Sequence, residues 1–302
     1  MEHEVSDIAF VTVNYNTCQL VENMLSFFDT ATLPFTYRVI IVDNASTDGS
    51  HEFLSGRTGI TYIPAGENLG YGKGINRGIQ ASESPYICVL NTDVVLNAES
   101  LARLWEFMVQ KPDVGVVSPV ILSRDGSMQG FVFHRALTSV LFNVINKIRS
   151  SLIKARVSRA TLPVKVQGVL GAFFLIRRSV ITGAHLFDED FFFYYEDTDL
   201  AHRLCDAGVI CYALPSCSVV HLGGASTSVE GARVFYRSKD IYIRKHYGDV
   251  TAWLVARVDR IRLKLKYAKY SILSGMCSSK RVEEKKVYYS AMQSVWAAGR
   301  NE

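Results

Sequence analysis

The sequence predicts an α/β fold, with a mostly parallel central sheet flanked by helices. In the N-terminal third of the chain, short apolar runs rich in β-branched residues alternate with segments of helical spacing. The apolar runs are continuous, as is typical of parallel strands buried on both faces. Three of these runs end in Asn or Asp. This places polar side chains at the carboxyl ends of the strands, where α/β sheets bind ligands.

The expected elements follow one another in a regular order. Strands are predicted at residues 8–14, 37–43, 60–64, 85–90 and 114–119. Helices are predicted at residues 19–30, 71–82 and 98–110, with a short one after the turn NASTDGS. One or two basic amphipathic helices are expected within residues 136–157, with Leu141, Ile145, Ile148 and Leu152 on one side. A helix over residues 251–273 is expected to have an apolar face made of Trp253, Leu254, Val258, Ile261, Leu265 and Ala268.

Length and composition indicate an ordinary globular protein. The 302 residues are enough for one large domain, or for one domain with an appendage, and 48% of them are hydrophobic. The six cysteines form no CxxC pair, which indicates free thiols in a reducing compartment. The N-terminus is too acidic and polar for a signal peptide, and no window approaches the roughly 18 to 20 apolar residues of a membrane span. We therefore expect a cytoplasmic protein that can still lie on a membrane.

The net charge of +4 is distributed unevenly along the chain. Between Gly126 and Phe187 there is no Asp or Glu, but there are nine Lys or Arg. Residues 233–269 contain eleven Lys or Arg against three Asp. Such blocks indicate anionic partners, namely phosphates, acidic lipid head groups or nucleic acid. For any single basic residue, a solvated surface position is the simpler explanation.

Polar residues follow three of the predicted strands directly. The strand ends read Asn14-Tyr15-Asn16, Asp43-Asn44 and Asn91-Thr92-Asp93. Each alone is explained by turn chemistry, but three such ends at one edge of a sheet make a polar cleft. A carboxylate with neighbouring oxygen donors suits a hard divalent cation that keeps substrate phosphate oxygens as ligands. His221, which also follows an apolar run, is a candidate further ligand, although a lone His at a strand end is more often a satisfied polar residue.

The segment from Phe187 to Gly208 places six carboxylates around an aromatic run and then leads into a predicted helix. The carboxylates are Asp188, Glu189, Asp190, Glu196, Asp197 and Asp199. Loss of solvation beside bulky apolar groups raises the pKa of a carboxylate, which suits a proton acceptor near neutral pH. The structural alternative is a solvated acidic loop before a helix whose N-terminal dipole favours Glu196 and Asp197.

Residues 67–78, ENLGYGKGINRG, combine glycines with Lys73 and Arg77. Glycines permit close approach of the backbone to a ligand, and the cations can meet a diphosphate. The spacing is not GxGxxG, and the segment follows the third strand rather than the first, which disfavours a nicotinamide dinucleotide. Asp43, at the end of the second strand, is placed to accept a hydrogen bond from a nucleobase N–H or a ribose hydroxyl.

Taken in order, these motifs resemble family 2 glycosyltransferases of the GT-A fold. The resemblance covers roughly residues 8–227, and the ordered set is specific although each piece alone is not. The matching segments are VTVNYNT, IIVDNASTDGS, NLGYGKGINRGI, VLNTDVVL, GAFFLIRRSV, FDEDFFFYYEDTDLAHRLCDAG and PSCSVVHLGG. Within the family, the chain is most similar to the rhamnosyltransferase-like members that build bacterial surface polysaccharides.

The resemblance implies a donor side for the site. Val13 and Tyr15 match positions that pack the base and ribose of a nucleotide. Asp43 matches the carboxylate that reads the base, and Asn44 lies next to it. Lys73 belongs to the segment that flanks the diphosphate.

The resemblance also implies a metal site for Mg²⁺ or Mn²⁺. Asn91-Thr92-Asp93 occupies the DxD position, so Thr92 lies on the donor side and Asp93 matches the metal carboxylate. His221 matches a histidine that completes the metal site in some relatives. Because the first position is Asn91, the site depends on one carboxylate and the donor phosphates, and we expect weak affinity for free metal.

On the acceptor side, Asp197 matches the general base that deprotonates the acceptor hydroxyl. Gly171, Ala172 and Glu196 match the lining of the acceptor pocket. The resemblance thus implies a metal-assisted, inverting hexosyltransferase. The best-matched donor is dTDP-rhamnose, with a UDP-sugar as the alternative. The expected acceptor is a saccharide, linked to a polyprenyl diphosphate.

Residues 1–227 are expected to form the catalytic domain, with a basic insertion at about 126–165, and residues 228–302 a basic helical extension. The extension suits an anionic surface on the inner face of the cytoplasmic membrane, with packing on its own domain or a homodimer partner as the alternative. Two other function classes stay open: a catalytically inactive nucleotide-sugar-binding scaffold, and a nucleic-acid-binding protein. We expect that the protein does not bind nucleic acid, because the sequence contains no recognisable nucleic-acid-binding motif.

Overall fold

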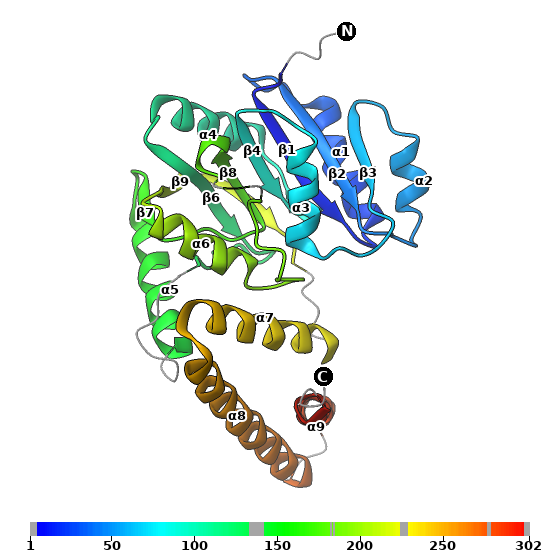
Figure 1. The fold of residues 1–302 in the computed structure, drawn as a ribbon, viewed down its shortest axis with the longest axis vertical. Coiled ribbons are helices and arrows are strands. Elements are labelled where there is room, and N and C mark those ends of the chain that lie inside the picture. Colours follow the sequence, from blue (N-terminus) through cyan, green and yellow to red (C-terminus); the bar gives the residue numbers. More distant parts are fainter. Residues whose placement is uncertain are drawn as a thin grey trace. The chain divides into compact units, whose positions relative to one another are not determined.

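A mixed sheet of nine strands organises the N-terminal part of the protein (Figure 1). The computed structural model describes residues 5–132, 142–181, 183, 185–223, 229–276 and 279–298. The strands are β1 (Ile8–Asn14), β2 (Tyr37–Asp43), β3 (Ile60–Pro64), β4 (Tyr86–Leu90), β5 (Val94–Val95), β6 (Val114–Leu122), β7 (Val164–Val166), β8 (Phe173–Arg177) and β9 (Ile210–His221). The strand order is β3-β2-β1-β4-β8-β6-β9-β5, and β7 pairs with β9.

Strands β3, β2, β1 and β4 run parallel to one another. Strand β8 lies antiparallel between β4 and β6, while β6 and β9 are parallel. The helices are α1 (Cys18–Thr30), α2 (Ser50–Ser55), α3 (Tyr71–Gln80), α4 (Ala98–Gln110), α5 (Phe142–Arg159), α6 (Glu196–Asp206), α7 (Val229–Tyr247), α8 (Asp249–Met276) and α9 (Lys280–Ala298). The α/β architecture with a mostly parallel sheet is therefore confirmed.

Alternate side chains of the strands enter two separate hydrophobic layers. Along β1, Ile8 and Phe10 pack with buried residues of α1 and α4, whereas Ala9 and Val11 pack with residues of α3 and α6. This two-residue period follows from the pleat of a strand, which sends successive side chains to opposite faces. Because both faces are covered by helices, the central strands β1, β2 and β4 are mostly apolar, and polar residues follow where these strands end.

Several of the expected boundaries agree with the structure. The strands at residues 8–14, 37–43 and 60–64 and the helix at residues 98–110 have the expected ends. The strand expected at 114–119 continues to Leu122. Helix α5 covers part of the expected 136–157 segment, of which residues 136–141 lie outside the described residues. On α5, the side chains of Ile148 and Leu152 are exposed, and those of Leu141 and Ile145 lie outside the described set.

The described chain divides into two compact units. The first holds the sheet, α1 to α4, α6 and most of α5, and the second holds α7, α8 and α9. Within the second unit, α8 packs against α7 and α9. The buried residues of α8 are Ala252, Val255, Asp259 and Leu263.

The apolar face expected on residues 251–273 is largely exposed on α8. Trp253, Leu254, Ile261 and Leu265 are each between 44% and 65% exposed. The buried face of the helix instead includes the carboxylate of Asp259, which accepts a hydrogen bond from Nζ of Lys239 over 2.5 Å. None of the described helices combines the length and the apolar character needed to cross a membrane.

Candidate active site

Hydrogen bonds join the carboxyl ends of three strands. Nδ2 of Asn14, at the end of β1, donates to Oδ1 of Asp43, at the end of β2, over 2.7 Å. The hydroxyl of Thr17 donates to Oδ1 of Asn14 over 2.7 Å. Since Thr17 has one hydroxyl hydrogen, its 3.1 Å contact with the hydroxyl of Thr92 is donated by Thr92. The network connects the predicted nucleotide side to the segment that follows β4.

Asp43 is almost fully buried and shapes the turn that follows it. Its Oδ1 also accepts the hydroxyl hydrogen of Ser46 over 2.6 Å, and its Oδ2 accepts the backbone N–H of Ser46 over 3.0 Å. Its neighbour Asn44 donates through Nδ2 to the carbonyl oxygen of Gly70 over 3.0 Å, which ties the end of β2 to the start of α3. Among these contacts, Oδ2 of Asp43 accepts a single bond and keeps one acceptor position.

The glycines of residues 67–78 allow close packing within the protein. A Cβ atom on Gly74 would lie 2.6 Å from a methyl carbon of Val13, and one on Gly78 would lie 2.4 Å from Val11. Gly70 has a φ of +80°, and a Cβ there would lie 2.3 Å from the carbonyl oxygen of Phe192. The glycines let α3 lie directly on β1 and under the acidic segment.

Other predicted donor-side residues are more accessible. Tyr15 is 49% exposed, and Lys73 is exposed on the first turn of α3. The side chains of Tyr15 and Lys73 thus face solvent. They take no part in the hydrogen-bond network described above.

Asp93 and His221 converge, as the sequence predicts for metal ligands. Oδ1 of Asp93 and Nε2 of His221 are 3.2 Å apart, and both side chains are about one-fifth exposed, at 18% and 19%. Backbone pairing fixes this approach, because Val94 lies opposite His221 in the antiparallel pair of β5 and β9. On its other side, Nδ1 of His221 lies 2.9 Å from Oε1 of Gln129.

The pair fits two adjacent positions around a divalent cation. Ligand atoms about 2.1 Å from an octahedral cation lie about 3.0 Å from each other. Among the described residues there is no cluster of three or more His, Cys, Asp or Glu side chains with metal-binding geometry. In the part of the chain that the structure describes, Asp93 and His221 thus form a pair of candidate ligands.

A two-residue segment, Gly171-Ala172, joins the strand-end groups to Asp197. The backbone N–H of Asn91 donates to the carbonyl oxygen of Ala172 over 2.9 Å. The N–H of Gly171 donates to Oδ2 of Asp197 over 3.3 Å, and its carbonyl oxygen accepts the hydroxyl hydrogen of Tyr71 over 2.7 Å. The structure thus brings together the predicted acceptor-side residues and the end of β4.

The acidic segment is held on α3 by specific bonds. The side chain of Asn76 donates to the carbonyl oxygen of Phe187 over 2.8 Å and accepts from its N–H over 2.9 Å. The N–H of Tyr71 donates to the carbonyl oxygen of Phe192 over 2.8 Å. At the end of the segment, Tyr194 and Tyr195 have φ values of +68° and +67°. Such left-handed backbone is costly for aromatic residues and is found at functional sites.

Glu196 and Asp197 differ in environment although they are neighbours. Burial, and then the charge of Asp197, raise the pKa of Glu196 to about 8. Its Oε2 atom is buried and has no hydrogen-bond partner among the described residues. Burial also raises the pKa of Asp197, while hydrogen bonds from Gly171 and Thr198 oppose the rise. Asp197 is partly exposed, whereas Glu196 is buried.

Tyr71 lies among the charged groups of the site. Burial raises the pKa of its hydroxyl well above the ordinary value, and the charges of Glu196, Asp197 and Asp93 raise it further. The residues that sequence reasoning missed are Thr17, Tyr71, Asn76 and Gln129. Tyr71 and Asn76 occur inside the NLGYGKGINRG motif, which marks this segment as part of the site. Gln129 lies in an irregular segment with no recognisable motif.

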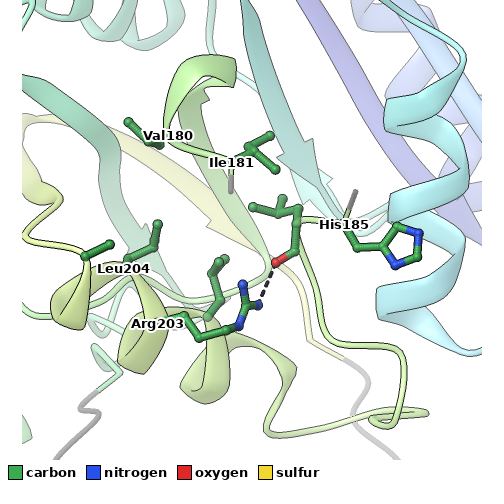
Figure 2. Close-up of a pocket in the computed structure, with 8 residues that line it drawn as sticks. Val180, Ile181, His185, Arg203 and Leu204 are labelled. Carbon is green, nitrogen blue, oxygen red and sulfur yellow. Dashed lines mark hydrogen bonds between the residues drawn. The ribbon is translucent and has the colours of Figure 1, made fainter. Parts of the chain in front are cut away.

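A separate small pocket lies beside α6 and is lined by apolar side chains with His185 and Arg203 (Figure 2). Its volume, about 10 Å³, is close to that of one water-sized sphere. The guanidinium of Arg203 spans its edge and donates to the carbonyl oxygen of Leu186 over 2.6 Å. This pocket is too small for a sugar nucleotide, and Arg203 serves to hold the acidic segment.

Comparisons with known proteins agree with this geometry. Residues 10–182 match the family model "Glycosyl transferase family 2". The chain is 30% identical, over 74% of its length and 78% of the relative, to an N-acetylglucosaminyl-diphospho-decaprenol L-rhamnosyltransferase of Mycobacterium tuberculosis. It is 25% identical to the rhamnosyltransferase WbbL of Escherichia coli, over 61% of this chain and 72% of that one.

A solved structure shares the fold at low identity. It is a mannosyltransferase from Pyrobaculum calidifontis in complex with GDP-Man and Mn²⁺, with a TM-score of 0.56 and 15% identity. The match covers 99% of this chain and 87% of that one. The expected GT-A fold is therefore confirmed.

Proposed function

The chain belongs to glycosyl transferase family 2, and we propose that it is an inverting hexosyltransferase that moves L-rhamnose from dTDP-rhamnose to a saccharide acceptor. One observation carries the proposal: Asn91, two residues before Asp93, and Asp197 both bond to the same short segment, Gly171-Ala172. This segment links the backbone that leads to the Asp93–His221 pair with the candidate proton acceptor. This is the arrangement that displacement of a nucleoside diphosphate requires.

The donor assignment rests on the relatives and on the strand ends. Two of the similar proteins are named as rhamnosyltransferases, and a UDP-sugar is the alternative donor. Val13, Tyr15 and Asn44 would line the nucleotide side, with Lys73 near the diphosphate. The remaining acceptor position on Oδ2 of Asp43 suits a base N–H or a ribose hydroxyl.

Asp93 and His221 would hold Mg²⁺ or Mn²⁺ together with the donor diphosphate, with Thr92 fixing the backbone before Asp93. A bound cation supplies neutralisation of the charge that develops on the leaving nucleoside diphosphate. Because the protein contributes one carboxylate and one imidazole, we expect the cation to bind mainly with the donor rather than alone.

Asp197 would remove the proton from the acceptor hydroxyl. A positioned carboxylate base contributes about 10²- to 10⁴-fold to the rate. The N–H of Gly171 orients Oδ2 of Asp197, and Glu196, with a pKa of about 8, keeps its own proton at neutral pH. A neutral Glu196 avoids a second charge beside the base. A single base that acts opposite the leaving group gives inversion at the anomeric carbon.

The acceptor is proposed to be a saccharide on a polyprenyl diphosphate, in the synthesis of a bacterial surface polysaccharide. The name of the M. tuberculosis relative describes action on a diphospho-decaprenol acceptor. Residues 1–227 would form the catalytic domain, with the basic stretch 126–165 on the acceptor side, and residues 228–302 would form the membrane-facing extension. A peripheral position on the inner face of the cytoplasmic membrane follows from such an acceptor.

The surface of α8 supports that position. At 100° per residue, its exposed apolar side chains form one stripe: Trp253, Leu254, Ile261, Leu265, Ile272 and Met276. On the same helical wheel, Arg260 lies beyond Trp253 on one side of the stripe, and Arg262 and Lys269 lie beyond Met276 on the other. Arg257 and Lys264 lie between Trp253 and the rest of the stripe, and the Arg257 guanidinium lies over the Trp253 ring. An apolar stripe between basic flanks fits an anionic lipid surface, where the apolar residues insert and the cations meet head groups. A homodimer contact is the alternative use of this stripe.

Thermal shift against a panel of dTDP-, UDP- and GDP-sugars, with and without Mn²⁺, tests the donor assignment. Binding to the folded state raises the melting temperature by mass action. We expect the largest rise with dTDP-rhamnose and Mn²⁺, and loss of the metal-dependent part in Asp93→Ala. Donor binding without transfer to polyprenyl-diphosphate-linked N-acetylglucosamine or to any other saccharide acceptor would favour the inactive scaffold instead.

A further inference from the structure

Gln129 contacts one residue, His221, through both ends of its amide. Oε1 of Gln129 lies 2.9 Å from the ring atom Nδ1, and Nε2 of Gln129 donates to the backbone carbonyl oxygen of His221 over 3.1 Å. The backbone N–H of Gln129 donates to the carbonyl oxygen of Ile121 over 2.8 Å, which ties this residue to β6. Hydrogen bonds therefore hold both the backbone of Gln129 and its side-chain amide.

These contacts determine which ring nitrogen of His221 carries a hydrogen. A backbone carbonyl oxygen only accepts hydrogen bonds, so the NH₂ group of Gln129 must face it. The amide oxygen then faces Nδ1, and because that oxygen also only accepts, Nδ1 must be the donor. In the neutral imidazole, the second nitrogen, Nε2, consequently carries a lone pair.

The lone pair of Nε2 faces a carboxylate. Oδ1 of Asp93 is 3.2 Å away and is itself an acceptor. Two acceptors at this distance repel each other unless a positive centre lies between or beside them. A divalent cation satisfies both, since carboxylate oxygen and neutral imidazole nitrogen are among its usual protein ligands.

We propose that Gln129 is a positioning residue of the cation site: it fixes the Nδ1–H tautomer of His221, so that Nε2 and Oδ1 of Asp93 face a divalent cation together. Gln129 acts through His221 and touches neither cation nor sugar. The proposal rests on the proposed function, because it deepens the cation site described there. Outer partners of metal-binding histidines typically change metal affinity by about 10- to 100-fold.

Two readouts test this role on the full-length protein. Nitrogen-15 NMR of histidine-labelled, metal-free protein, at a pH where imidazole is neutral, reports the tautomer of His221 directly. We expect Nδ1–H in the wild type and Nε2–H in Gln129→Leu, which removes both amide contacts. Titration with Mn²⁺ followed by electron paramagnetic resonance, alone and with dTDP or UDP, should show about 10- to 100-fold weaker binding in Gln129→Leu.

Two further variants make the test selective. Gln129→Glu keeps an acceptor for Nδ1–H, so its tautomer should match the wild type even where Gln129→Leu fails to fold. Gln110→Leu is the matched control, because Gln110 is exposed and its amide bonds to Glu106 on the surface of α4. We expect the control to leave both readouts unchanged.

The outcomes distinguish the role of Gln129 from the cation site itself. An Nε2–H tautomer in the wild type or in Gln129→Glu overturns the proposal. Weaker Mn²⁺ binding in His221→Ala, without any weakening in Gln129→Leu, overturns the role of Gln129 alone. Unchanged Mn²⁺ binding in His221→Ala and Asp93→Asn overturns the cation site of the proposed function, and this role with it.

Discussion

The backbone of Gly171 bonds to Asp197 and to Tyr71 at once. Its N–H donates to Oδ2 of Asp197 over 3.3 Å, and its carbonyl oxygen accepts the hydroxyl hydrogen of Tyr71 over 2.7 Å. Tyr71 begins α3 and is buried, so Asp197, the proposed base, is oriented by a peptide group that α3 holds in place. The position of Asp197 therefore depends on the packing of α3 as well as on its own helix.

Tyr71→Phe should loosen this arrangement. The substitution leaves the buried carbonyl oxygen of Gly171 without its partner, which costs about 1–3 kcal/mol of unfolding free energy. We expect turnover to fall together with stability, measured by urea unfolding and initial rates. Tyr62→Phe is the control, because its hydroxyl contacts His51 at an exposed site, and it should change the unfolding free energy by less than about 0.5 kcal/mol. Equal stability of the two variants would contradict this role of Tyr71.

The buried Glu196 should make stability depend on pH. Its pKa is raised from 4.5 to about 8, so between these values the folded protein binds more protons than the unfolded chain. The stabilisation is complete below the unfolded pKa and is lost as pH rises through the folded pKa.

Glu196→Gln removes this dependence because glutamine does not ionise. We expect its melting temperature to fall by several degrees less than that of the wild type between about pH 5 and about pH 9. Differential scanning calorimetry across this range measures the difference, and Glu106→Gln, on the exposed side of α4, serves as the control. Parallel pH profiles of Glu196→Gln and wild type would show that Glu196 ionises as an ordinary carboxyl group.

Gly74→Ala should push α3 away from the sheet. The new methyl group would lie 2.6 Å from Val13, whose own position on β1 is confined. Overpacking of this kind costs about 1–3 kcal/mol. Gly56→Ala is the matched control, since its Cβ would lie 3.8 Å from the nearest backbone oxygen. Urea unfolding that shows equal stability for both variants would contradict the packing role of the glycines.

The strands could be predicted where an apolar run ends at a polar residue. Strands β1 and β2 were predicted with their observed ends, because strands covered on both faces are continuous apolar runs that stop at polar residues. The ends of β3, a half-buried edge strand, were also predicted. Strand β8 was not predicted as an element, although FFLIR is apolar, and its antiparallel place between β4 and β6 depends on long-range pairing that sequence order does not encode. On α8, periodicity located the apolar stripe, which is exposed, whereas the face that contains Asp259, paired with Lys239, is the buried one.

Sequence motifs predicted the residues proposed to bind the cation and to accept the proton, but not the residues that position them. Asp93 and His221, for example, were predicted as metal ligands, and their side chains lie 3.2 Å apart. The roles of Thr17, Asn76 and Gln129 depend on contacts between segments 75 to 111 residues apart, which local pattern does not reveal. The packing role of the glycines was not predicted, because close backbone approach to a ligand and close approach to another strand require the same residue type.

The stripe on α8 should bind anionic vesicles. Ile261→Glu with Leu265→Glu places two charges in the apolar stripe, so cosedimentation with phosphatidylglycerol vesicles should decrease strongly. Val109→Glu, at a similarly exposed apolar residue of α4, should leave it unchanged. Wild-type binding should weaken as salt rises, because the flanking cations are screened. Vesicle binding that is equal in all three proteins would favour another use of the stripe.

Donor affinity and turnover should separate in Asp197→Asn. Asparagine keeps the size of the side chain but does not accept a proton at neutral pH. We expect a dTDP-rhamnose affinity within about threefold of the wild type and a kcat lower by about 10²- to 10⁴-fold. Asp113→Asn, at an exposed surface residue, should change neither value. A kcat within tenfold of the wild type would contradict the assignment of Asp197 as the base.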